Sequence, residues 1–290
     1  SAGGSPDGAT DIIVARTDFV ALVELIIALY RELPLDHDDT LWTEMRFFTL
    51  VADMEGLQSV TLLSKLALAV SSGKKGTEKL YQALVDSDLG KLDFDEMFGH
   101  FQHVVSRKPA LTIIGSQQGV LGGPGTPQQY ANDAELHPEE ARALESYCAI
   151  FVTIFRWHPS YAHAMVQAHD PNPVSLLWQL VNRNIPATTK AAVLDTINAF
   201  CAAAGEVNPK ALEMSLSELD KLGVKSVKDV QGLASISVSQ ASTTSPHHDT
   251  ARAWLFNLEM NDAKSNTAVA RSALVRLFRT LMDDRATSPS

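Results

Sequence analysis

The sequence predicts an all-α protein, an irregular armadillo- or HEAT-like α-solenoid in which helix pairs and triplets stack. Apolar residues recur at helical spacing, while strand-like alternation is nearly absent. Long apolar helices open 48 residues apart, at Pro138 and Pro186. This spacing is close to the ~40–47 residues of armadillo and HEAT repeats, which stack on their neighbours. Five prolines stand where a first helical position is expected: Pro138, Pro159, Pro173, Pro186 and Pro209.

The composition is that of a folded protein that does not bind nucleic acid directly. The chain has 290 residues, 45% of them apolar and 20% charged, and a net charge of −10. Nucleic-acid binding needs clustered Lys and Arg, and no such face dominates. The most apolar stretch, residues 18–33, is interrupted by Glu24 and is too short for a membrane span of ~20 apolar residues. Cys148 and Cys201 both lie in apolar helical stretches, which favours buried thiols in a reducing compartment.

The N-terminal half is predicted to consist of a linker and helical repeats. Residues 1–10 lack the features of a signal peptide and are interpreted as a linker or cloning scar. The missing initiator Met suggests a segment of something longer. Residues 11–106 contain five predicted helices, which span roughly 17–33, 40–54 and 57–71 and then begin at Thr77 and at Asp93.

Local signals mark the ends of these helices. The first ends before Pro34, which cannot continue a helix, and the third stops at Gly73. In the fifth, Asp93 and Glu96 have the spacing of a capping box. Two apolar stripes are predicted to face the core: Leu41, Met45, Phe48 and Ala52 in the second helix, and Phe94, Met97, Phe98, Phe101 and Val105 in the fifth.

The C-terminal half alternates repeats with connections. Residues 107–136 hold five glycines and three prolines and are predicted to form a flexible glycine-rich loop. Armadillo/HEAT-like repeats follow over 137–223, with Asn208 capping the helix at Pro209. A Ser-rich connection covers 224–248, and any strand within it would have no partner. Residues 249–290 form a terminal helix pair, roughly 249–259 and 267–283, and a tail.

The histidine-rich stretch FRWHPSYAHAMVQAHD, residues 155–170, raises the question of a metal or acid–base site. Spacings of five and six residues separate His158, His163 and His169, so the side chains diverge at ~100° per residue. A zinc pair on one helix needs a spacing of four. We therefore interpret this stretch as a repeat corner with solvated or capping histidines. Trp157→Ala should then cost ~3–5 kcal/mol, as for a buried aromatic, and His163→Ala almost nothing.

A second candidate site is the row Glu96, His100 and His103, whose spacings of four and three align the side chains. A metal-dependent enzyme using this row is one hypothesis, which predicts bound zinc or iron. The row also lies opposite the predicted apolar stripe, where an amphipathic helix keeps its polar groups. We therefore favour a solvated face.

Other motifs carry no chemistry. No G-x-S-x-G motif is present, and the glycine run at 115–125 lacks the ending of a phosphate-binding loop. Asp249 in the HHD stretch at 247–249 is better explained as a helix cap. A row of basic residues lies in the last predicted helix: Arg271, Arg276, Arg279 and Arg285. This basic row could dock an acidic partner, but cations are also favourable near the C-terminal end of a helix. We predict no catalytic, cofactor-binding or metal-binding residue, no cofactor and no enzymatic activity.

Most of residues 11–285 resembles a known family, the largest α-helical scaffold nucleoporins of the inner ring of the nuclear pore. In that family a helix pair with a Gly-terminated end precedes an aromatic-rich helix, and a long helix then ends in an Arg-Trp corner. The matching stretches are LPLDHDDTLWTEMRFFTLVADMEGLQSVTLLSKLALAVSSG, LDFDEMFGHFQHV, ELHPEEARALESYCAIFVTIFRWHPSYAHAMV and EMNDAKSNTAVARSALVRLFRTL. The glycine-rich stretch at 107–136 and the weakly helical 224–248 depart from the pattern.

The resemblance implies a function that the residues alone do not. It implies a piece of a long superhelical solenoid that shapes the inner ring and supports nucleocytoplasmic transport of protein and mRNA. The implied partners are linker and adaptor segments of other nucleoporins, and phenylalanine-glycine repeats are a further candidate. The implied location is the nuclear pore complex, and the family carries no catalytic residue. The alternative is a transport-receptor-like or general adaptor solenoid that binds phenylalanine-glycine repeats or cargo peptides.

Overall fold

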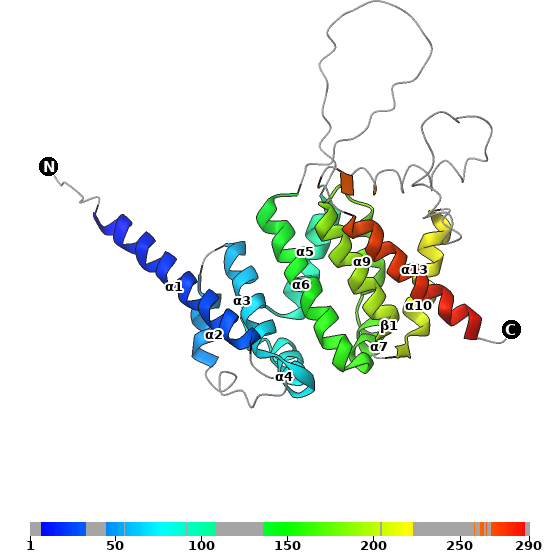
Figure 1. Cartoon of the computed structure of the whole chain (residues 1–290), viewed down its shortest axis with the longest axis horizontal. Helices are drawn as coiled ribbons and strands as arrows, with labels where there is room; N and C mark the ends of the chain where they lie inside the picture. Colours follow the sequence, from blue (N-terminus) through cyan, green and yellow to red (C-terminus); the bar gives the residue numbers. More distant parts are fainter. Residues whose placement is uncertain are drawn as a thin grey trace, which may run out of the picture.

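The protein is a helical domain, seen here in a computed structural model (Figure 1). The structure describes residues 7–32, 45–54, 56–90, 92–107, 136–203, 205–222, 258, 262–263, 265 and 268–287. Within these residues a single short hairpin interrupts the succession of helices. The predicted all-α class is therefore confirmed at the level of a packed helical domain.

Five helices form a row through the molecule, in the order of the sequence. α3 packs against both α1 and α6, and α9 packs against both α6 and α13. Figure 1 shows this row running from the blue to the red end of the chain. Its members are α1 (Asp7–Arg31), α3 (Leu57–Val70), α6 (Pro138–Trp157), α9 (Ala187–Cys201) and α13 (Val269–Thr287).

Shorter helices cover this row. α2 packs on α3, α4 on α6, and α5 on α6 and α8, while α7, α8 and α10 pack on α9. Their bounds are Met45–Ala52 for α2, Gly73–Val85 for α4, Phe94–Ser106 for α5, Pro159–Ala168 for α7, Pro173–Val181 for α8 and Pro209–Lys221 for α10.

One continuous apolar core joins these helices. At its centre the ring of Phe151 in α6 lies 5.5 Å from Phe98 of α5 and 6.0 Å from Phe200 of α9, measured between centroids. Such aromatic pairs add about 0.5–1.5 kcal/mol beyond the burial of their area. The predicted stripe of α5 is confirmed except at its end, where Val104 is buried and Val105 is half-buried.

Helix starts follow the predicted local signals at most positions. Pro138, Pro159, Pro173 and Pro209 occupy the first position of α6, α7, α8 and α10. The carboxylate of Asp93 accepts a hydrogen bond of 2.7 Å from the backbone N–H of Glu96, and the side chain of Asn208 caps α10 through the N–H of Ala211 at 3.3 Å. Pro186 departs from the prediction because it is the N-cap of α9, which begins at Ala187.

Two predicted helix starts are wrong. α1 begins at Asp7, ten residues before the predicted start and inside the predicted linker 1–10. Extending an existing helix is far cheaper than nucleating one, so the helix continues N-terminal to the predicted start.

The other error is in α4, which begins at Gly73 and not at Thr77. A Cβ atom at Gly76 would lie 2.8 Å from the backbone carbon of Ser71, so a glycine is required where the two helices approach. Gly76, which looks like a helix breaker in the sequence, is thus a packing requirement. The hydroxyl of Thr77 donates back to the carbonyl of Gly73 at 2.9 Å, inside the first turn.

The hairpin was not predicted. β1 (Ala202–Ala203) and β2 (Glu206–Val207) pair antiparallel around Gly205, whose φ of 83° is in the region that favours glycine. Two residues per strand are too few for an alternation to be read from the sequence.

The last helix, α13, begins two residues after the start of the predicted helix 267–283 and ends four residues after its end.

Several predictions fall on residues that the structure does not describe. They concern the stretches 108–135 and 223–257, which include the glycine run, the Ser-rich connection and the histidine pair with Asp249. Of the predicted helix 249–259, only Leu258 is described, and it is buried.

Candidate functional site

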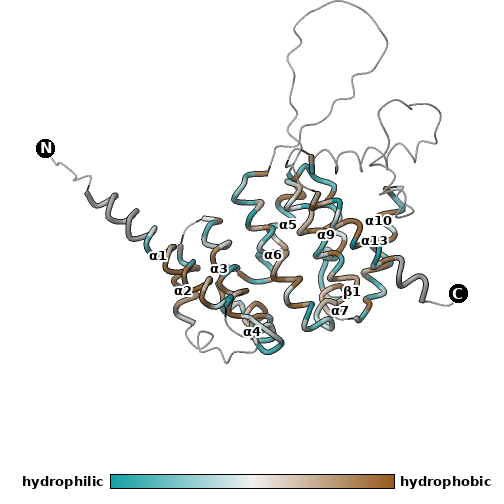
Figure 2. The backbone as a smooth tube through the Cα atoms, in the orientation of Figure 1, coloured by the Kyte–Doolittle hydropathy of each residue, from teal (hydrophilic) through white to brown (hydrophobic). Residues whose placement is uncertain are grey.

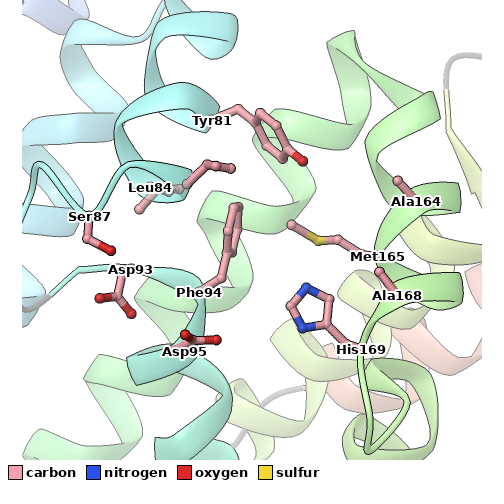
Figure 3. Close-up of a pocket in the computed structure, with 11 residues that line it drawn as sticks. Tyr81, Leu84, Ser87, Asp93, Phe94, Asp95, Ala164, Met165, Ala168 and His169 are labelled. Carbon is pink, nitrogen blue, oxygen red and sulfur yellow. The ribbon is translucent and has the colours of Figure 1, made fainter.

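A pocket of about 240 Å³ opens between the end of α4, the start of α5 and one face of α7. Buried side chains form its apolar floor, namely Leu84, Phe94 and Met165. Figure 3 shows the ring of Phe94 and the thioether of Met165 at its centre. α4 and α5 follow one another in the sequence, whereas α7 lies some seventy positions further on, so no single stretch of sequence encodes this hollow.

Polar groups line two sides of the pocket. Ser87, Asp93 and Asp95 lie on one side, and His169 lies on the other, beside the small side chains of Ala164 and Ala168 (Figure 3). Asp93 already caps α5, whereas the carboxylate of Asp95 is exposed and has no hydrogen-bond or ion-pair partner within the described residues.

Tyr81 lines the pocket beside α4. The rings of Tyr81 and Tyr161 are stacked, with centroids 3.7 Å apart and an interplanar angle of 9°. Burial, and to a smaller extent Tyr161, raises the pKa of Tyr81, so its hydroxyl stays protonated at neutral pH. Tyr81 therefore offers the pocket one π-face and a neutral hydrogen-bonding group.

The pocket can bind but has no arrangement suited to catalysis among its described residues. A hydroxyl nucleophile would need a base within hydrogen-bond reach. Ser87 and His169 lie on opposite sides of the hollow (Figure 3), with no hydrogen bond between them among the described residues. Across the part of the chain that the structure describes, no group of three His, Cys, Asp or Glu side chains is placed to hold a metal ion.

The structure separates the histidines of the corner at 155–170. His158 ends α6 and precedes α7, His163 lies within α7, and His169 reaches the pocket. They do not converge, as predicted. His158 is not solvated, however: it is buried, and its Nε2 lies 2.9 Å from the carbonyl oxygen of Lys74 in α4. The corner is thus attached to α4 by an imidazole that we interpreted from the sequence as solvated or capping.

α6 ends at Trp157, but the prediction that this tryptophan is buried is wrong. Its side chain is 37% exposed, while Phe155 two positions earlier is fully buried. Of the two tryptophans that the structure describes, the one in the core is Trp178 in α8, which is 1% exposed. Both tryptophans stand in apolar helices, and the sequence does not show which one faces a neighbouring helix.

The row Glu96, His100 and His103 is not a shared site. Glu96 and His103 are exposed, whereas His100 is half-buried with its ring 5.8 Å from that of Tyr147 in α6. Burial lowers the pKa of His100, and the nearby Glu140 opposes this shift. One side chain of the row therefore packs on a neighbouring helix while the others face solvent.

The two cysteines and Arg276 of the basic row are held by contacts within the chain. Cys148 and Cys201 are buried, as predicted, and burial raises the pKa of each thiol to about 12. In the basic row, Arg276 of α13 makes three hydrogen bonds of 2.8–3.1 Å to Asp195 of α9. Arg276 thus pairs within the chain, and the side chain of Arg285 is outside the described residues.

A second apolar surface lies on α1. Its exposed face carries leucines one helical turn apart, and Figure 2 shows the C-terminal half of the helix as predominantly hydrophobic. The leucines are Leu22, Leu25 and Leu29, exposed by 49%, 55% and 60%. None of the described helices is long and apolar enough to cross a membrane.

Sequence reasoning missed the pocket. The one local signal was the acidic stretch DSDLGKLDFDE, residues 86–96, in which Phe94 stands between two aspartates. The contribution of α7 comes from residues some seventy positions further on, and only folding brings them to α5.

Helices packed in layers around one core, with apolar hollows on the surface, define the class of helical scaffold and binding modules. Residues 3–289 match the family Nup192, described as nuclear pore complex scaffold, nucleoporins 186/192/205. The chain belongs to this family of nuclear pore complex scaffold nucleoporins. No curated protein and no solved structure gave a significant match.

Membership confirms the resemblance seen in the sequence. The protein is a component of the nuclear pore complex, where its partners are other nucleoporins. The family is structural and not enzymatic.

Proposed function

We propose that this chain is a segment of an armadillo/HEAT-like solenoid in the inner ring of the pore, and that it binds short linker and adaptor segments of other nucleoporins. The observation that carries the proposal is the row in which α1, α3, α6, α9 and α13 pack in the order of the sequence. In a solenoid each repeat contacts its neighbours, so helices in the same position of successive repeats form such a row.

The covering helices support the same interpretation. Between α6 and α9 the chain forms α7 and α8, and between α3 and α6 it forms α4 and α5. In each stretch the chain forms two short helices beside the row and then returns to the row. Stacked helix groups of this kind expose long surfaces that bind extended or helical peptides.

We also propose that residues 11–106 and 137–223 are two helical blocks of one stack, joined by 107–136 and followed by 224–248 and the helices of 249–290. Two polar contacts support this division. Arg107 forms an ion pair with Glu140, and Arg183 donates to the carbonyl of Val105. The ion pair between Arg107 and Glu140 holds together the two ends of the connection.

The proposal is tested by affinity capture from nuclear extract with the tagged chain as bait. We expect other pore components, and linker or adaptor nucleoporins in particular, to be enriched over a tagged unrelated helical protein. Enrichment of a defined complex unrelated to the pore, without nucleoporins, would contradict the proposal.

The alternative is a transport-receptor-like surface that binds phenylalanine-glycine repeats. The observation that favours it is the apolar floor of Leu84, Phe94 and Met165, which suits an aromatic side chain. Titration of a phenylalanine-glycine peptide separates the two functions: saturable, rapidly reversible binding in the micromolar range favours the receptor, and weaker or no binding favours the scaffold.

A further inference from the structure

We propose that the pocket between α4, α5 and α7 is a docking site for a short peptide segment in which a large apolar residue stands next to an arginine or lysine. This inference rests on the proposed function, because it names the chemistry of one bound segment. It assigns the apolar residue to the floor of the pocket and the basic residue to its acidic side.

The size of the pocket favours a single peptide side chain over a small molecule. Its volume of about 240 Å³ is below the ~300–1,000 Å³ typical of small-molecule sites. The floor is apolar, and the side chains that form it are buried against the core, so it is preformed. Desolvating a ring on such a floor gives roughly 25 cal/mol per Å² of apolar area covered.

The acidic residues around the pocket favour a basic residue next to the bound apolar side chain. Asp93 and Asp95 line it, and residues 86–96 contain five acidic residues and one lysine. Of the charged or titratable side chains that line the opposite side, His169 is the one described. An acidic segment would be repelled by this rim, whereas a cation next to the anchor residue pairs with Asp95.

Arginine gains a further contact. The half-buried ring of Tyr81 lines the same hollow (Figure 3), and a guanidinium within ~6 Å of its centroid is attracted to the π-face that Tyr161 does not cover. In an uncharged phenylalanine-glycine segment the phenylalanine would pack on the floor. The segment has no cation to pair with the acidic rim or to contact the π-face. The pocket therefore discriminates by the residue beside the anchor.

The test is fluorescence anisotropy with the purified chain and three labelled peptides that differ at one position. The probes are Gly-Ser-Phe-Arg-Ser-Gly, Gly-Ser-Phe-Gly-Ser-Gly and Gly-Ser-Phe-Glu-Ser-Gly. We expect saturable binding of the Phe-Arg peptide, weaker binding of Phe-Gly and the weakest of Phe-Glu. The Phe-Arg affinity should fall as salt rises, because the rim charges are exposed.

Two variants locate the site without disturbing the core. Ala168 is exposed on the rim, so Ala168→Trp fills the pocket and should weaken binding of all three peptides at least ten-fold. Asp95→Asn should weaken only the Phe-Arg peptide, by about three-fold, as expected for one exposed ion pair. Glu213→Gln on α10, also an exposed acid, is the matched control and should change nothing.

Three results would overturn the proposal. They are no binding of the Phe-Arg peptide to the wild-type chain, equal binding of Phe-Arg and Phe-Glu, and undiminished binding to a correctly folded Ala168→Trp protein, as judged by its circular dichroism. If these occur while the tagged chain still captures nucleoporins, the docking site is wrong and the scaffold function stands. If the peptide binds but capture brings down an unrelated complex, the site stands and the scaffold function is wrong.

Discussion

The indole Nε1–H of Trp178 donates a hydrogen bond of 3.2 Å to the hydroxyl oxygen of Ser215, 37 positions further along the chain. Both side chains are buried, Trp178 in α8 and Ser215 in α10. The same hydroxyl lies 3.3 Å from the sulfur of Cys201 at the end of α9. A single oxygen thus connects three helices and satisfies an indole N–H that would otherwise be buried without a partner.

Trp178→Ala should destabilise the protein by about 3–5 kcal/mol, because it removes a fully buried aromatic side chain and its hydrogen bond. Trp157→Ala should cost only about 1 kcal/mol, since that side chain is 37% exposed. Urea unfolding followed by circular dichroism measures both. Equal losses for the two variants would show that the described burial of these tryptophans is wrong.

Ser215→Ala should cost about 1–3 kcal/mol, because the indole N–H of Trp178 loses its acceptor while remaining buried. Ser217→Ala is the matched control: the same substitution on the same helix at an exposed position, with an expected change within ~0.5 kcal/mol. The same urea titration applies. A neutral Ser215→Ala would mean that the indole finds another partner.

His158→Ala should cost about 1–2 kcal/mol, since it removes the contact with the carbonyl of Lys74 and the stacking with Tyr161 at 5.0 Å. His163→Ala should be nearly neutral, as the sequence already indicated. Thermal unfolding of the pair compares them directly. If His163→Ala destabilises as much as His158→Ala, the contact between the corner and α4 is not what stabilises it.

Arg276→Ala should cost about 0.5–1 kcal/mol at low salt, because the guanidinium makes several hydrogen bonds to Asp195 but is half-exposed. The loss should shrink as salt is added. Arg279→Ala, an exposed arginine of the same helix, should change stability little. A double-mutant cycle of Arg276 and Asp195 isolates the coupling energy. A cycle that shows no coupling at low salt would contradict the ion pair.

The buried Lys190 predicts an alkaline pH dependence. Burial lowers its pKa from 10.5 to about 8, and Asp262 opposes this shift. Asp262 itself accepts hydrogen bonds of 3.1 and 3.0 Å from the backbone N–H groups of Ala270 and Arg271 at the start of α13. Between pH 8 and pH 10.5 the unfolded state therefore binds more protons at this site than the folded state, so the contribution of Lys190 to stability rises with pH.

Wild type should gain on the order of 2 kcal/mol relative to Lys190→Met between pH 8 and pH 10. Both thiols, whose pKa values are raised to about 12, act in the opposite direction above pH 9. They do so equally in the two proteins, so the difference between the proteins isolates Lys190. Urea unfolding of both proteins at matched pH values measures this difference in the free energy of unfolding. Parallel plots of that free energy against pH for the two proteins would refute the prediction.

The sequence was informative where a helix boundary depends on a few adjacent residues. Proline at a first helical position loses no needed hydrogen bond, and Asp or Asn before it satisfies free backbone N–H groups. These preferences predicted the starts of α5, α6, α7, α8 and α10. The order and spacing of the apolar helices also carried the resemblance to scaffold nucleoporins, which the family match confirms.

Contacts between distant segments decided what the sequence did not show. His158 is buried because its ring contacts Lys74 of α4, and Trp157 is exposed because no described helix covers it. The pocket exists only where α7 comes to lie beside α5. The sequence by itself thus determined the helical class, most helix starts and the family, because backbone capping and helical periodicity act over a few residues. Only the tertiary structure decided which apolar and polar side chains meet, because their environment depends on residues far away in the chain.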